Sequence, residues 1–275
     1  MKPLVPLLWL LPLVQAAPTL PEPEPEPAPS APALSAAVPS AAVPSVVPTP
    51  AVEKRNLEPD TKYFHEPGQD NELGHYDIRY FSHKIEYEEH RPALRHLIRS
   101  YLTTFRKLGV ETWLAHGTLL GWWWNGRIMP WDYDLDVQVS AATLYYLGQH
   151  HNRSTYEYRY RDEASGEIKL KEYLLDVNPH HVERGRGDGQ NVIDARWIDT
   201  ANGMFIDITG LAEREPTADP GIWSCKNFHR YRTRDLYPMR ESEFEGVPAT
   251  VPYSFDRILT EEYGMKSLVT TEWEG

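Results

Sequence analysis

The sequence has little of three things that commonly decide the class of a protein: cysteine, positive charge and long apolar runs. Cys225 is the single cysteine among 275 residues, which excludes an intrachain disulfide and leaves stability to a hydrophobic core. The 28 Lys and Arg residues are outnumbered by 40 Asp and Glu residues, which gives a net charge of -12. Binding to a nucleic-acid backbone needs a basic surface, so we expect no nucleic-acid partner.

The first residues have the pattern of a secretory signal. Lys2 supplies a positive charge, Leu4–Val14 form an apolar run interrupted by prolines, and the next small residue is Ala16. The run is too short to cross a bilayer, which needs about 20 apolar residues. We therefore expect a cleaved signal peptide at 1–16, with a short signal anchor as the alternative. The chain would then enter the secretory lumen and either stay in the Golgi or be secreted.

Residues 17–62 are rich in proline, alanine, serine and glutamate and nearly free of aromatic residues. Such a composition buries too little apolar surface to fold, so we expect a disordered linker or pro-segment there and a folded domain over 63–275. Lys54-Arg55 is either a dibasic processing site or a pair of ordinary solvated charges. Asn152 opens an Asn-Arg-Ser triplet, which is a glycosylation acceptor if the chain is secretory.

Hydrophobic spacing within 63–275 indicates a mixture of helices and strands. It predicts helices over 86–109, 118–126, 141–151 and 254–264, and strands over 110–117, 131–140, 166–177 and 195–211. The strands within 166–177 are expected to be hairpin-like, and those within 195–211 to turn at Asn202-Gly203. Residues 184–190 and the remainder of the C-terminal part are expected to be loops. The whole pattern predicts an α+β fold.

The stretch "WDYDLDVQVS" places acids at every second position. In a strand, Asp134 and Asp136 share one face, while the apolar residues between and after them share the other. Two carboxylates at this spacing repel each other unless a cation lies between them, and Mg²⁺ or Mn²⁺ prefers such oxygen ligands. The sequence therefore predicts a divalent-metal site, with a solvated acidic strand edge as the alternative.

Two neighbouring stretches favour the metal site. In "HGTLLG", Gly117 permits close backbone approach and Thr118 opens a helix whose N-terminus suits a phosphate, although a simple strand-to-helix turn has the same pattern. In "MFIDITG", Asp207 lies within an apolar strand and needs a partner. Asp207 is either a third carboxylate of the site, the base for an attacking hydroxyl, or a buried structural residue. This layout is that of a nucleotidyltransferase-like fold.

The stretch "AHGTLLGWWWNGRIMPWDYDLDVQVS" resembles the signature of the LicD/fukutin family. The resemblance implies a nucleotidyltransferase-like mixed sheet flanked by helices and the transfer of a phosphorylated group from a nucleotide diphosphate donor to a glycan. It assigns Asp134 and Asp136 as catalytic metal ligands and Asp132 as a third acid. Gly117 and Thr118 would hold the donor phosphate. Bacterial members more often have an aspartate where Tyr133 stands here.

Longer stretches resemble one branch of that family, the fungal proteins required for mannosylphosphate addition to cell-wall mannan. They include "YFHEPG", "HYDIRYF", "NVIDARWIDTANGMFIDITGL" and "SFDRILTEEYG". This resemblance implies GDP-mannose as the nucleotide-diphosphate-sugar donor and an N- or O-linked mannan glycan as the acceptor. A CDP-linked donor of phosphocholine is the alternative. Two non-catalytic hypotheses for the function also remain: the chain is a regulator or second subunit of another transferase, or it is a carbohydrate-binding module.

Further residues could contact substrate. His116 precedes the phosphate turn, Trp123 could stack on a base or sugar, and Arg127 and Arg196 could neutralise the donor phosphate. Each of them could equally be structural, as could the further cations Arg184, Arg186 and Lys226. His180-His181 has no cysteine or further histidine at a zinc-like spacing, so the sequence predicts no zinc motif there.

Overall fold

A computed structural model describes residues 61–163, 165–185 and 190–270. The signal peptide predicted at 1–16, the dibasic pair Lys54-Arg55 and Arg186 lie outside these residues, as does nearly all of the predicted 17–62 segment. Thr61, at the end of that segment, already contacts the folded part, because its backbone N–H donates to Gln190 Oε1 at 3.1 Å. Within the described ranges, no helix is both long and apolar enough to span a membrane.

The described residues form a mixture of helices and strands. The helices are α1 (Tyr87–Leu108), α2 (His116–Asn125), α3 (Ala141–His150), α4 (Thr233–Leu236) and α5 (Phe255–Tyr263), with short 3₁₀ turns η1 (Leu73–His75), η2 (Pro179–Val182) and η3 (Met265–Leu268). The strands are β1 (Trp113–Leu114), β2 (Asp136–Ser140), β3 (Ser154–Arg161), β4 (Ile168–Val177), β5 (Ala195–Asp199), β6 (Phe205–Glu213), β7 (Ile222–Ser224), β8 (Arg230–Arg232), β9 (Arg240–Phe244) and β10 (Val247–Val251).

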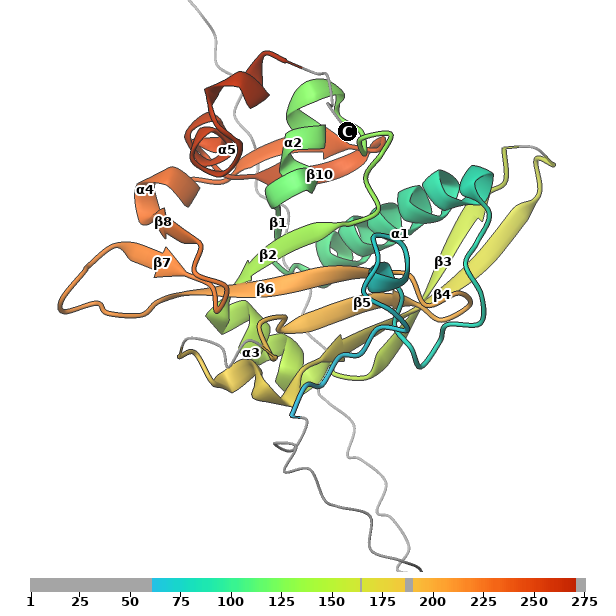
Figure 1. Ribbon diagram of the computed structural model, residues 1–275, viewed down its shortest axis with the longest axis horizontal. Coiled ribbons are helices and arrows are strands. Elements are labelled where there is room, and N and C mark those ends of the chain that lie inside the picture. Colours follow the sequence, from blue (N-terminus) through green and yellow to red (C-terminus); the bar gives the residue numbers. More distant parts are fainter. Residues whose placement is uncertain (1–60, 164, 186–189, 271–275) are drawn as a thin grey trace, which may run out of the picture. The chain divides into compact units, whose positions relative to one another are not determined.

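The main sheet is mixed, as the family resemblance implied. Its strands run in the order β1-β2-β6-β5-β4-β3, and β7 joins β6 to β8. β2 and β6 are parallel, whereas the other neighbours are antiparallel. β9 and β10 form a separate hairpin. Figure 1 shows this hairpin, α2 and α5 gathered beside the β1 edge of the sheet. The α+β class with a mixed sheet flanked by helices is therefore confirmed.

Helix α1 covers one face of this sheet (Figure 1). Its apolar residues recur at helical spacing, and Leu97, Ile98 and Phe105 are fully buried. Gly109 ends the helix in a left-handed conformation, at φ 66°, which a residue without a Cβ adopts at little cost. The indole N–H of Trp197 on β5 donates to Ser100 Oγ at 3.0 Å and joins the helix to the sheet.

The opposite face of the sheet carries polar side chains. On β6, Ile206 lies opposite Trp197 and belongs to the main core, whereas Asp207 lies opposite Arg196 and beside Asp136 of β2. Side chains alternate along a strand, so these three charged residues share the face turned away from α1. The segment that contains η1 crosses this face (Figure 1). It covers a second, smaller apolar cluster that includes Phe205.

The predicted strand at 131–140 begins later than expected. β2 starts only at Asp136, because side chains in the preceding acids form local hydrogen bonds. Asp132 Oδ1 accepts from the Asp134 N–H at 3.1 Å, and Asp134 Oδ1 accepts from the Leu135 N–H at 2.9 Å. Aspartate competes with strand pairing in this way. The expected core contacts are confirmed for Leu135 and for the two valines of the strand, all of which are buried.

Three other predictions need correction. The strand expected over 110–117 is only β1, because helix α2 already begins at His116 and not at Thr118. The stretch 166–177 is a single strand, β4, and its hairpin partner is β3 from the preceding polar stretch. The C-terminal part, expected to be loops before its helix, contains the short strands β7 to β10. These strands are three to five residues long, which gives too few alternations to detect. The predicted hairpin with a turn at Asn202-Gly203 is confirmed, with Gly203 at φ 89°.

Close packing of α2 against the next loop requires a glycine at position 121. A Cβ there would lie 2.6 Å from the carbonyl oxygen of Arg127, so the helix or the loop would have to shift. We expect Gly121→Ala to lower the free energy of unfolding by about 1–3 kcal/mol, as overpacking does. Thermal unfolding measures this effect. Gly185→Ala is the matched control, since its Cβ meets no atom within 4 Å, and an equal loss in both variants would contradict the packing argument.

Candidate functional site

The acids singled out in the sequence lie around one hollow region. Three adjoining cavities share Asp134 in their walls, and the one that also contains Asp136 and Asp207 has a volume of about 590 Å³. Asp136 opens β2 and lies beside Asp207 of the parallel strand β6. The Asp207 N–H donates to the carbonyl oxygen of Leu135 at 2.9 Å, which fixes the strand start against its neighbour. A parallel strand pair therefore presents two carboxylates at adjacent positions.

Helix α2 brings its N-terminus to the same region. Thr118 Oγ1 accepts from the Asp136 N–H at 2.9 Å, so the helix and β2 are joined where the acids begin. A Cβ on Gly117 would lie 3.3 Å from Asp132 Oδ2, which shows how closely the helix backbone approaches that acid. The first N–H groups of a helix have no partner within it and favour negative charge. Gly117 and Thr118 thus lie in the first turn of α2, next to the acids, and their role in binding phosphate stays a prediction.

The carboxylates repel one another in this setting. Burial raises the pKa of Asp136 well above its usual value, and the nearby charges of Asp134 and Asp207 raise it further. Burial likewise raises the pKa of Asp132 to about 6. For Asp207, burial outweighs the attraction of the Arg196 guanidinium and raises the pKa to about 6. A divalent cation would remove this repulsion, so the residues present fit a hard metal ion.

Arg196 lies deep in the wall of an adjoining cavity, with 3% of its side chain exposed. Its Nε donates to Asp207 Oδ1 at 2.9 Å and its Nη2 donates to Glu66 Oε1 at 2.5 Å. Its guanidinium also lies 3.5 Å from the centroid of the Phe205 ring. Arg196 Nη1 has no hydrogen-bond partner among the described residues, but it lies 3.8 Å from Oδ2 of the buried Asp77. Arg196 therefore compensates three protein carboxylates.

Other predicted substrate contacts lie elsewhere. Trp123 packs on Phe255, with ring centroids 5.0 Å apart, and its indole N–H donates to the carbonyl oxygen of Leu268. Neither Trp123 nor the exposed Arg127 lines a cavity that contains Asp134. Among the described residues, the Phe, Tyr and Trp side chains that line those cavities are Phe64, Trp131, Tyr133 and Tyr263. Asn152 is exposed in the turn before β3, and its Oδ1 accepts from the Val177 N–H at 2.9 Å.

His116 belongs to a polar network at one end of the 590 Å³ cavity. Its Nδ1 lies 2.9 Å from Glu262 Oε2, and Tyr231 Oη donates to Glu262 Oε1 at 2.8 Å. Burial opposes ionisation of Glu262, but these two hydrogen bonds lower its pKa. The ring of His229 packs on that of His116, with centroids 4.2 Å apart, and burial lowers the pKa of His229.

Several residues of the region were not identified from the sequence as functional. They are Glu66, His75, His229, Glu262 and Tyr263. His75 Nε2 lies 3.9 Å from Asp134 Oδ2. Most of these residues fall within stretches that carry the family resemblance, "YFHEPG", "HYDIRYF" and "SFDRILTEEYG". The resemblance of those stretches to the family was the one indication that they are functional. Nothing in their sequence indicated that they lie next to the aspartates in the fold.

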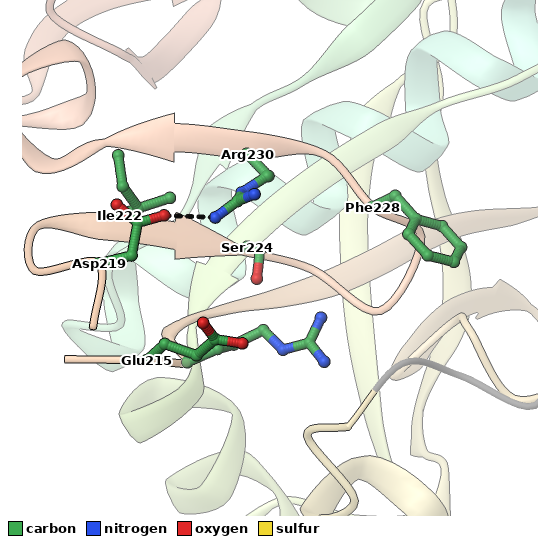
Figure 2. Close-up of a pocket in the computed structure, with 7 residues that line it drawn as sticks. Glu215, Asp219, Ile222, Ser224, Phe228 and Arg230 are labelled. Carbon is green, nitrogen blue, oxygen red and sulfur yellow. Dashed lines mark hydrogen bonds and ion pairs between the residues drawn. The ribbon is translucent and has the colours of Figure 1, made fainter. Parts of the chain in front are cut away.

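A further cavity lies at the β7–β8 hairpin, and Figure 2 shows its lining. Its volume is about 200 Å³, and it shares no residue with the cavities around Asp134. Arg230 there donates to Asp219 Oδ2 at 2.5 Å, so the cation is already paired with an acid of the same wall (Figure 2). The clustered acids distinguish the Asp134 region as the candidate site.

The raised pKa values predict how a metal ion stabilises the protein at different pH. The folded Asp132 and Asp207 have pKa values of about 6 against a usual 3.8, so the folded state holds protons that the unfolded state has lost. The free energy of unfolding therefore falls as pH rises between these values. We expect saturating Mg²⁺ or Mn²⁺ to raise the melting temperature by about 5 °C at pH 7 and by less than half of that at pH 5. Equal shifts at both pH values would contradict the prediction.

The chain is similar to one known protein family and to two yeast proteins. The family model described as "LicD/FKTN/FKRP, nucleotidyltransferase domain" matches residues 109–254. The Saccharomyces cerevisiae protein named Mannosyltransferase regulator 4 is 36% identical over 221 residues, which cover 77% of this chain and 17% of that protein. Mannosyltransferase regulator 14 of the same organism is 38% identical over 142 residues, 50% of this chain and 14% of that protein. The chain thus spans about a sixth of the length of these relatives.

Proposed function

The chain belongs to the LicD/FKTN/FKRP nucleotidyltransferase-domain family, and on that premise we propose that it transfers a phosphorylated sugar to a glycan with the help of a divalent metal ion. The observation that carries this proposal is the cluster of repelling carboxylates around Asp136. The proposed donor is GDP-mannose and the proposed acceptor is a mannan glycan in the secretory lumen, where Asn152 would be glycosylated.

Asp134 and Asp136 are the proposed metal ligands, and Asp132 would support them. Asp134 is suited to this role because 41% of its side chain is exposed and it lines all three adjoining cavities. When bound, Mg²⁺ or Mn²⁺ would neutralise the negative charge that develops on the transferred phosphate. The N–H groups at the start of α2, beside Gly117, would hold a phosphate oxygen of the donor.

Asp207 is the proposed proton acceptor. A mannose hydroxyl of the acceptor would attack the phosphorus next to the donor sugar, the bond from that phosphorus to GMP would break, and GMP would leave. The attacking oxygen must lose a proton, and a carboxylate whose pKa is raised to about 6 takes one more readily than an ordinary aspartate. The hydrogen bond from Arg196 Nε to Asp207 Oδ1 holds that carboxylate in place in the wall of the cavity.

A second candidate function is regulation of another transferase. Both similar yeast proteins carry the name "Mannosyltransferase regulator", and this chain corresponds to 17% or less of their length. A regulator would use the same fold to bind a transferase or its nucleotide-sugar without turnover. The clustered carboxylates favour catalysis, because a purely structural surface gains nothing from acids that repel one another.

The test is a screen of GDP-, CDP- and UDP-linked donors with the purified chain, Mn²⁺ and mannan oligosaccharides. We expect release of a nucleoside monophosphate that depends on both metal and glycan, with the GDP-linked donor preferred. Release with a CDP-linked donor alone would change the substrate and keep the reaction type. Turnover only after a second transferase is added would support the regulator and refute the catalytic proposal.

A further inference from the structure

A second group of metal-binding side chains lies in the cavity that contains Asp136. His116 comes from the start of α2, His229 from the turn before β8, and Glu262 from the end of α5. One ligand atom from each of the three lies within 4.8 Å of the other two. We propose that these residues bind one transition-metal ion of the Zn²⁺ class, at a site separate from the aspartates. This goes beyond the proposed transfer reaction and does not depend on it.

The type of ligand selects the metal. Two imidazole nitrogens and one carboxylate suit Zn²⁺ or Co²⁺, whereas Mg²⁺ prefers an all-oxygen site such as the aspartates provide. His116 Nδ1 lies 2.9 Å from Glu262 Oε2. Ligand atoms on a tetrahedral Zn²⁺, each about 2.0–2.1 Å from the metal, lie about 3.3 Å apart. A shift of a few tenths of an ångström therefore brings this pair of atoms to the spacing of metal ligands, and the ligand atom of His229 lies within 4.8 Å of both.

Two of the proposed ligands are oriented by a neighbour, as metal ligands usually are. Tyr231 Oη donates to Glu262 Oε1 at 2.8 Å, which leaves Oε2 facing His116. Cys225 Sγ lies 3.4 Å from His229 Nδ1, which leaves Nε2 for the metal. Metal binding at Nδ1 places the ring proton of His116 on Nε2, which faces the amide nitrogen of Gln138 at 3.4 Å, so these two donors would have to move apart.

The same cavity wall contains one more polar atom. Thr209 is 7% exposed, lines the cavity with all three proposed ligands, and its Oγ1 has no hydrogen-bond partner among the described residues. A buried hydroxyl oxygen without a partner is costly unless a ligand or water satisfies it. Three protein ligands leave a fourth position on Zn²⁺ for an exogenous oxygen. Thr209 is placed in the wall of the cavity where such an oxygen would be bound.

The test uses the full chain, freed of metal with a chelator and titrated with Co²⁺ in excess Mg²⁺, which occupies the aspartates. We expect one Co²⁺ per chain with the visible absorption bands of a low-coordinate nitrogen and oxygen site, and competition by Zn²⁺. His229→Gln and Glu262→Gln should each weaken Co²⁺ binding by at least about tenfold. His180→Gln is the matched control, since His180 lies outside the cavity and pairs with Glu183. Asp134→Asn should keep these absorption bands.

Two results would overturn the proposal. One is folded protein that takes up no Co²⁺, and the other is equal Co²⁺ affinity in the parent, His229→Gln and Glu262→Gln. Circular dichroism would identify a variant that fails to fold. In that case the remaining variant decides the question, because the glutamine at 262 can keep a hydrogen bond to Tyr231 while losing the carboxylate charge.

Discussion

Asp136→Asn is expected to abolish transfer, with a loss of at least about 10³-fold in kcat. The substitution keeps the shape of the side chain and removes one proposed metal ligand. A metal ion contributes several kcal/mol to the stabilisation of transition-state charge, and each 1.36 kcal/mol corresponds to about a tenfold change in rate. The backbone contact from the Asp136 N–H to Thr118 Oγ1 does not involve the changed atoms, so the junction of α2 and β2 should persist. Steady-state kinetics with Mn²⁺ measures the effect.

The stability of this variant separates a functional role from a structural one. Burial and the charges of Asp134 and Asp207 make an ionised Asp136 unfavourable, and the neutral amide removes that repulsion. Without metal, the melting temperature should therefore stay equal or rise, and the gain on adding Mn²⁺ should largely disappear. Asp256→Asn, at an exposed position on α5, is the matched control and should change neither quantity. A sharp fall in melting temperature for Asp136→Asn would assign the residue to folding instead.

Arg196→Met is expected to cause the largest loss of stability. Arg196 is 3% exposed and pairs with Asp207 and Glu66. Glu66 also pairs with Lys62, so removal of Arg196 leaves chiefly the Asp207 carboxylate without its cation. Breaking a buried ion pair in this way costs about 3–5 kcal/mol, which corresponds to a fall of about 10 °C in melting temperature for a domain of this size. Differential scanning calorimetry of the metal-free protein measures it.

Two further variants test the reason for this loss. Arg106→Ala removes an exposed ion pair with Glu241 and should cost less than about 1 kcal/mol. The double variant Arg196→Met with Asp207→Asn should be more stable than Arg196→Met alone, because it removes the unpaired charge together with its partner. Additive losses in the double variant would mean that Arg196 stabilises the fold by packing on Phe205 and not by compensating Asp207.

The sequence predicts the fold best where a pattern runs over many residues. The buried face of α1 repeats over six turns, and the β5–β6 hairpin combines alternation with an Asn-Gly turn, so both were correctly assigned. The start of β2 was placed too early because the aspartates of "WDYDLD" accept hydrogen bonds from their own backbone. Alternation of residue types cannot distinguish that local bonding from strand pairing.

The candidate site was predictable in its acids and not in its surroundings. Asp134, Asp136 and Asp207 line one cavity because β2 and β6 are parallel neighbours, and each strand carried its own polar signal. Glu262 reaches the cavity from a helix 146 residues away from His116, a distance that no motif spans. The search for a zinc-like spacing around His180-His181 could detect only ligands that are close together in the sequence. It could not detect the three ligands that the fold brings together from α2, α5 and the β7–β8 turn.

The most direct test of the central claim follows the phosphorus atom of the donor. GDP-mannose labelled with ³²P on the phosphorus next to mannose and with ¹⁴C in the sugar would be incubated with the purified chain, Mn²⁺ and mannan oligosaccharide. The proposed reaction places both labels on the glycan in equal amounts and releases GMP, and neither label moves with Asp136→Asn. Transfer of ¹⁴C without ³²P, with GDP as the product, would contradict it, as would no transfer of either label by the folded chain.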